Sequence, residues 1–144
     1  MRILAVDLGK ARTGLAICGA DEKLASPAGV IADRNKISLM QKIATRADSG
    51  AVECIVVGLP RNMDGSEGES ARNARGFAED LQKMVDIPVV LRDERGTTIT
   101  AHDYLNKTNT RGKKRKAVVD AVAATIILQD YLDYRRNQRE KKEE

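Results

Sequence analysis

The sequence is poor in several side chains on which binding and catalytic sites often depend. Its 144 residues include no Trp, one Phe and three Tyr, which nearly excludes aromatic platforms for stacking single-stranded bases. One histidine, His102, is too few for a histidine-rich metal site. The two cysteines, Cys18 and Cys54, each lie in an apolar run, and their spacing fits neither a metal knuckle nor a redox pair. We therefore expect both to be reduced, buried thiols.

Long hydrophobic runs are absent as well. No stretch approaches the roughly 20 apolar residues that cross a bilayer, and the amino terminus has no signal-peptide pattern. We therefore expect a soluble, cytoplasmic protein. A chain of 144 residues can bury one sizeable core, whereas two cores would both be marginal. We predict one domain over residues 1–134, followed by a charged tail at 135–144 that is frayed or disordered.

Positive charge is modest in total but concentrated in one segment. The chain has 25 Lys and Arg against 21 Asp and Glu, a net charge of +4. Residues 107–116 contain no acid and six basic residues, namely Lys107, Arg111, Lys113, Lys114, Arg115 and Lys116. Such a run is either a solvated segment that aids solubility or a contact for the phosphate backbone of nucleic acid. The residues that follow it favour the second interpretation.

Strand and helix signals alternate along the chain. Apolar runs predict strands at residues 3–6, 13–18, 27–31, 54–57 and 89–91. Helical periodicity predicts helices at residues 36–49, 70–85 and 116–134, the first of which would bury Ile37, Met40 and Ile43. A short turn between the first two strands predicts an antiparallel hairpin. The order indicates an α/β fold, a mixed central sheet opened by this hairpin with helices packed on its faces.

Acidic residues interrupt or follow these apolar elements at three places. Asp7 ends the first strand on the face of Ile3 and Ala5, where a carboxylate is costly unless it is paired; it could instead be a turn residue. Asp120 interrupts an apolar helix, although it could serve only the helix dipole. Asp93 and Glu94 follow the strand at 89–91, and either could be the functional acid.

Convergence of Asp7, Glu94 and Asp120 would create a site with oxygen ligands only. Mg²⁺ and Mn²⁺ prefer such ligands, and two of these ions can support in-line cleavage of a phosphodiester. The basic segment before Asp120 would hold the polyanion beside them. Arg12 and Arg95 are further candidates for phosphate contacts, with surface ion pairs as the alternative.

Four blocks of the sequence resemble the YqgF family, small bacterial proteins with an RNase H-like fold described as pre-16S rRNA nucleases and as Holliday junction resolvases. The blocks lie in order at residues 7–16, 58–66, 93–98 and 116–124. The resemblance implies that Asp7, Glu94 and Asp120 are the catalytic, metal-binding acids. Gly96 departs from the family pattern, which usually has a bulky apolar residue there.

Together these features predict a hydrolase, a nuclease dependent on Mg²⁺ or Mn²⁺ that cuts structured nucleic acid. By resemblance its substrate is the 5′ end of pre-16S rRNA in ribosome biogenesis, and the protein acts as a monomer or homodimer. The predicted nucleic-acid contacts are Arg12, Arg95, Arg111, Lys113, Lys114, Arg115 and Lys116.

Three alternatives accompany this prediction. A Holliday junction resolvase acting on branched DNA in recombination or repair is a close variant of it. A noncatalytic nucleic-acid-binding module predicts a missing acid, and none is missing. An actin- or hexokinase-like ATPase would need two such domains around ATP, and the chain has length for one.

Overall fold

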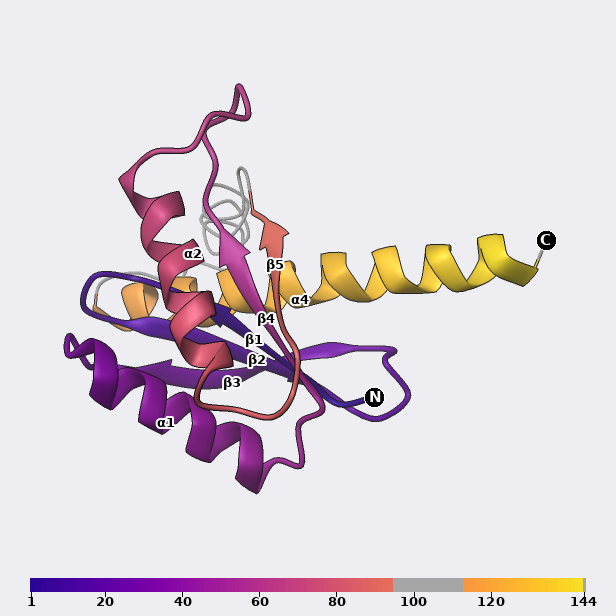
Figure 1. Ribbon diagram of the computed structural model, residues 1–144, viewed down its shortest axis with the longest axis horizontal. Coiled ribbons are helices and arrows are strands. Elements are labelled where there is room, and N and C mark those ends of the chain that lie inside the picture. Colours follow the sequence, from indigo (N-terminus) through magenta and orange to yellow (C-terminus); the bar gives the residue numbers. More distant parts are fainter. Residues whose placement is uncertain (95–112, 144) are drawn as a thin grey trace.

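The protein, in a computed structural model that describes residues 1–94 and 113–143, is built on a five-stranded sheet (Figure 1). The strands are β1 (Ile3–Asp7), β2 (Thr13–Cys18), β3 (Ala25–Ile31), β4 (Cys54–Leu59) and β5 (Val89–Asp93). Helices in the described part of the chain are α1 (Lys36–Ser49), α2 (Glu69–Gln82) and α4 (Lys113–Glu143). Within α4, side chains are described from residue 121 to residue 142. The α/β fold predicted from the sequence is confirmed.

Strand pairing places the carboxyl ends of three strands at the same end of the sheet. The strand order is β3-β2-β1-β4-β5. The predicted hairpin is confirmed, because β1 and β2 are antiparallel with Asp7 opposite Gly14. β1 is parallel to β4, and β4 is parallel to β5. The carboxyl ends of these three parallel strands therefore lie side by side, the usual position for a functional site in such sheets.

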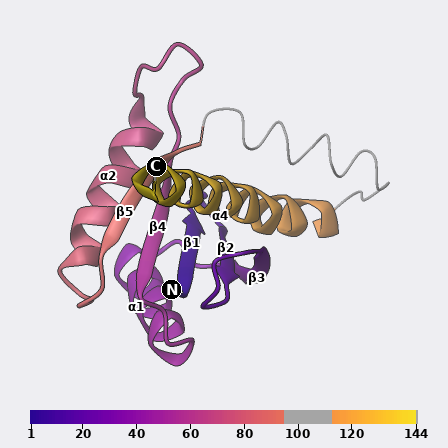
Figure 2. The ribbon, with the colours of Figure 1, turned by 90° about the vertical axis from the view of Figure 1, so that its right-hand side faces the viewer.

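Helices cover both faces of the sheet, with α1 and α2 on one and α4 on the other (Figures 1 and 2). Leu4 and Val6 of β1 pack with α1 and α2, whereas Ile3 and Ala5 pack with α4. Because side chains alternate along a strand, Asp7 belongs to the α4 face, as predicted. Cys18 and Cys54 are free thiols buried on that face, which confirms the expectation for them, and burial raises the pKa of both.

Helix α1 shows where local patterns succeed and fail. It spans the predicted range, begins after Asn35, whose side chain accepts a hydrogen bond from the Ser38 amide, and ends at Gly50. Ile37, however, is 63% exposed, and Leu39 packs in the core in its place. Ile37 therefore lies on the solvent side of the first turn, where the apolar pattern does not correspond to burial. None of the helices in the described ranges combines the length and apolarity needed to span a membrane.

Helix α4 is longer than expected. We predicted an end at residue 134 with a frayed tail, but the helix continues to Glu143 and projects past the sheet (Figure 1). Arg135 donates to the Glu22 carboxylate with an Nε–Oε1 distance of 2.6 Å, and Arg139 donates to the same oxygen at 3.1 Å. The Glu22 side chain is only 8% exposed. This buried carboxylate anchors residues that look like a solvated tail in the sequence.

We predict that the Glu22 carboxylate stabilises the folded protein at neutral pH and that this stabilisation is lost in acid. Its hydrogen bonds, first of all from Arg135, lower the pKa of Glu22 from 4.5 to about 2. Because the folded-state pKa is the lower one, this stabilisation is complete above about pH 5 and disappears as the pH falls toward 2. Glu22→Gln should lower the free energy of unfolding at pH 7 by roughly 1–3 kcal/mol.

Urea unfolding at pH 7 and pH 3 measures this effect. The deficit of the Glu22→Gln variant should shrink at pH 3, where the wild-type carboxylate is losing its advantage. Asp21→Asn is the matched control, since Asp21 is exposed and accepts only a local amide hydrogen bond among the described contacts. An equal deficit at both pH values would contradict the role assigned to the Glu22 charge.

Candidate active site

Asp7 and Glu94 meet at the end of the sheet where the carboxyl ends of β1, β4 and β5 lie side by side. Asp7 is the last residue of β1, and Glu94 directly follows β5. Their side chains share a hydrogen bond, although β4 lies between their strands. The backbone amide of Glu94 donates to the Leu59 carbonyl at 3.1 Å, which continues the β4–β5 ladder past the end of β5. The tertiary structure thus brings together two acids that lie far apart in the sequence.

Gly58 is what allows Glu94 to lie across β4. A Cβ atom at Gly58 would lie 2.9 Å from the carboxyl carbon of Glu94 and 2.8 Å from Cδ1 of Ile127. Real Cβ contacts are essentially never this short, so any other residue at this position would displace the ends of both side chains. Gly58 was not among the residues predicted for the site. Its signal in the sequence is a glycine inside a strand of bulky apolar residues, a position that often marks a close approach.

The structure distinguishes the two adjacent acids, between which the sequence left the choice open. The Asp93 carboxylate faces Arg61, with an Nη1–Oδ2 distance of 3.8 Å, and Arg61 also pairs with Glu67 at 3.3 Å. Glu94, the next residue, contacts Asp7 instead. The two side chains point in different directions because neighbours alternate across a strand. Glu94 is therefore the partner of Asp7.

Two carboxyl groups in this half-buried place influence each other strongly. Burial raises the pKa of Glu94 most, and the negative charge of Asp7 raises it further. Like charges at such short range resist simultaneous ionisation unless a cation or a proton lies between them. The pair is therefore a place where positive charge is stabilised.

The remaining predicted residues are placed only in part. Asp120 lies in α4 one turn before Ala124, which packs on the sheet face shared by Ile127. Its side chain, and those of Lys113, Lys114, Arg115 and Lys116 at the start of α4, lie outside the described side chains. Arg95, Gly96 and Arg111 lie outside the described residues altogether. Arg12 is half-buried in the turn that follows Asp7. Among described residues, no three His, Cys, Asp or Glu side chains form a metal cluster.

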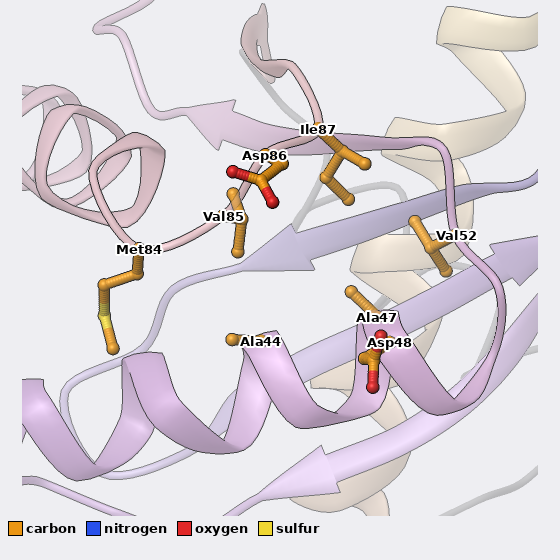
Figure 3. Close-up of a pocket in the computed structure, with 8 residues that line it drawn as sticks. All are labelled: Ala44, Ala47, Asp48, Val52, Met84, Val85, Asp86 and Ile87. Carbon is orange, nitrogen blue, oxygen red and sulfur yellow. The ribbon is translucent and has the colours of Figure 1, made fainter.

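A separate hollow lies at the opposite end of the sheet (Figure 3). It is lined by Ala44, Ala47, Asp48, Val52, Met84, Val85, Asp86 and Ile87, which precede β4 and β5 or belong to α1. Asp7 and Glu94 lie at the carboxyl ends of the same sheet, so this hollow takes no part in their chemistry.

Sequence comparison identifies the family. The family described as RuvX, Holliday junction resolvase, matches residues 1–134. A protein of Anaeromyxobacter sp. named "Putative pre-16S rRNA nuclease" is 44% identical over 135 residues, which cover 94% of this chain and 98% of that protein. A protein of Halothermothrix orenii with the same name is 42% identical over 134 residues, 93% of this chain and 96% of that protein.

Solved structures with the same fold are resolvases of distant sequence. RuvC of T. thermophilus in complex with a Holliday junction substrate aligns with a TM-score of 0.60 at 14% identity, covering 95% of this chain and 96% of that one. The fowlpox virus resolvase with Holliday junction DNA gives a TM-score of 0.53 at 12% identity, covering 93% and 98%. At this identity the likeness shows the RNase H-like fold alone. By its sequence match over residues 1–134, the chain belongs to the RuvX family of nucleases, also called YqgF, and it has their RNase H-like fold.

Proposed function

We propose that this protein is a metal-dependent nuclease that hydrolyses phosphodiester bonds of structured nucleic acid, with the 5′ end of pre-16S rRNA as its substrate. The observation that carries the proposal is the Asp7–Glu94 pair at the carboxyl ends of β1 and β5, beside Gly58. The names of the curated relatives support the choice of substrate. Such a substrate would be met in the cytoplasm.

The side chains of this pair suit a hard divalent cation. Both ligands are carboxylates, and the charge of Asp7 raises the pKa of Glu94, so a cation between them would relieve their repulsion. Asp7, Glu94 and Asp120 would hold Mg²⁺ or Mn²⁺, ions that favour all-oxygen sites. When bound, such an ion supplies an activated water and stabilises charge on the leaving oxygen.

Basic residues on two sides of this pair are proposed to hold the substrate. Arg12 lies in the turn after Asp7, and Lys113 to Lys116 form the first turn of α4, the helix that packs over Asp7's face. Together with Arg95 and Arg111, they would contact phosphates and make binding dependent on salt. We propose that these cations bind the substrate first and that one phosphodiester then lies at the divalent cation that the two carboxylates would hold.

A resolvase of branched DNA is the second candidate, favoured by the family description. That reaction cuts two strands symmetrically, so it would call for a homodimer. Cleavage of RNA ends would proceed with a monomer or a homodimer.

A parallel cleavage assay tests both candidates. The protein should cut a precursor rRNA carrying the 5′ end of 16S rRNA when Mg²⁺ is present, and EDTA should stop this cleavage because the carboxylates alone activate no water. A synthetic four-way junction is assayed beside it, with light scattering to report the oligomeric state. Cleavage of the four-way junction but not of the precursor rRNA would contradict the rRNA substrate and support a resolvase. Cleavage that persists in EDTA would contradict a metal-dependent reaction.

A further inference from the structure

A second groove lies on the sheet face opposite the carboxylate pair, between α1, α2 and the turn that follows β1. Its floor is apolar and is formed by Leu8, Leu39 and Phe77. Around this floor stand four cationic residues and one carboxylate, namely Lys10, Arg34, Lys36, Arg72 and Asp33. An adjoining hollow shares Leu8, Gly9 and Lys10 and extends to Pro60 and to Glu69 and Ser70, the first residues of α2, so it carries one carboxylate of its own.

The charge of this groove is positive even after its ion pairs are considered. Lys42 pairs with Asp33 at 2.8 Å, so the one carboxylate of the groove is already neutralised from outside it. Lys36 pairs with Asp80. No ion pair among the described residues involves Lys10, Arg34 or Arg72, and all three side chains are exposed. Three cations therefore face a groove that contains no uncompensated acid among its lining residues.

Gly76 lines this groove and places no side chain in it. It lies in the middle of α2, one turn after Arg72, where glycine is unfavourable for a helix. A Cβ atom at Gly76 would meet nothing within 4 Å, so packing does not require glycine there. The space that a side chain would fill belongs to the groove. Glycine at position 76, although it weakens the helix, is explained if a ligand in the groove has to pass over this side of α2.

The groove starts next to the residues of the site. Leu8 and Gly9, which line it, directly follow Asp7 at the end of β1. A Cβ atom at Gly9 would lie 2.1 Å from the Arg12 carbonyl oxygen, so this turn is tightly closed. Asp7 belongs to the α4 face, whereas the next residue, Leu8, packs on the α1 and α2 face. A polyanion bound at the carboxylate pair could therefore continue over this turn into the groove.

We infer that this groove binds the sugar–phosphate backbone of a second segment of the nucleic-acid substrate, away from the bond that is cut. Lys10, Arg34 and Arg72 contact its phosphates, and the apolar floor of Leu8, Leu39 and Phe77 receives its sugars. The inference rests on the proposed function, because it extends the same substrate beyond the carboxylate pair. It explains why a site that cuts one bond would select nucleic acid with a second arm or stem.

Binding without cleavage tests this inference. The full chain is titrated in EDTA against a fluorescent four-way junction and a fluorescent duplex RNA stem, at several KCl concentrations. Arg34→Gln with Arg72→Gln should weaken binding and reduce the slope of log Kd against log salt by about two, one for each lost phosphate contact. Gly76→Gln should also weaken binding although it removes no charge, whereas Gly76→Ala should raise the melting temperature and bind better than Gly76→Gln.

Matched controls separate the groove from charge in general. Arg2→Gln with Lys23→Gln removes the same charge from exposed residues near the amino end of β1 and should leave the slope unchanged. An equal slope for the groove variant and this control would overturn the inference. A changed oligomeric state in light scattering with unchanged affinity would also overturn it, since the groove would then join two copies.

The nuclease proposal and the groove inference are tested by different measurements, so that one can fail without the other. Lys113→Gln with Lys114→Gln and Arg115→Gln should lower the salt slope whether or not the groove binds nucleic acid. If this variant loses affinity and the groove variant does not, the nuclease proposal stands and the groove inference fails. If the groove variant loses affinity while the wild-type protein cuts neither substrate in Mg²⁺, binding in the groove stands and the nuclease proposal fails.

Discussion

Asp7→Asn and Glu94→Gln should each reduce Mg²⁺-dependent cleavage by more than about a hundredfold, because loss of even an outer partner of a metal ligand costs such sites 10–100-fold. Each substitution keeps the shape of the side chain and removes the negative charge that would hold the cation. Without metal, the raised pKa of Glu94 leaves a proton between the two carboxyl groups, and an amide at either position can donate that hydrogen bond instead. The melting temperature without metal should therefore not fall.

Asp93→Asn is the control for this pair of variants. Asp93 is adjacent to Glu94 in the chain, but its carboxylate faces Arg61 and not Asp7. The cleavage rate of the Asp93→Asn variant should stay near that of the wild-type protein. Asp120→Asn should behave like Asp7→Asn if Asp120 is the third acid of the site. Cleavage retained by a pure, folded Asp7→Asn or Glu94→Gln variant would remove these acids from the proposed mechanism.

Gly58→Ala should reduce cleavage about a hundredfold, the usual effect of misplacing a reacting group by about 1 Å. The added methyl group would overlap the Glu94 carboxyl group and Ile127, at 2.9 and 2.8 Å. The Glu94 carboxyl group has to leave its place beside Asp7, and Cδ1 of Ile127 has to move within the core. We expect a loss of roughly 1–3 kcal/mol in the free energy of unfolding, as for other overpacked cores.

A second substitution separates the two effects of Gly58→Ala. Ile127→Val removes the Cδ1 atom that the new methyl group would meet, so combining it with Gly58→Ala should restore part of the stability. Glu94 would still be displaced, and cleavage should stay low. Full recovery of cleavage in the double variant would show that α4 packing, not Glu94, was the cause.

Much of the fold could be predicted because its signals are local. The β1–β2 hairpin and the bounds of α1 depend on neighbouring residues, and both agree with the structure. Ile37 and residues 135–143 of α4 were predicted incorrectly for a shared reason. Whether Ile37 is buried depends on which face of α1 packs against the sheet, and the end of α4 depends on Glu22, which lies 113 residues before Arg135.

The sequence by itself determined that Asp7 lies on the face later covered by α4, because alternation along one strand needs no information from elsewhere. It also determined the family, because four blocks of the sequence resemble it and the family match covers residues 1–134. Only the tertiary structure shows that Glu94, and not Asp93, contacts Asp7, since that contact depends on how the end of β5 pairs with β4. Gly58 likewise acquires its role only when Glu94 and Ile127 arrive from β5 and α4, because a missing side chain matters only where distant residues occupy its space.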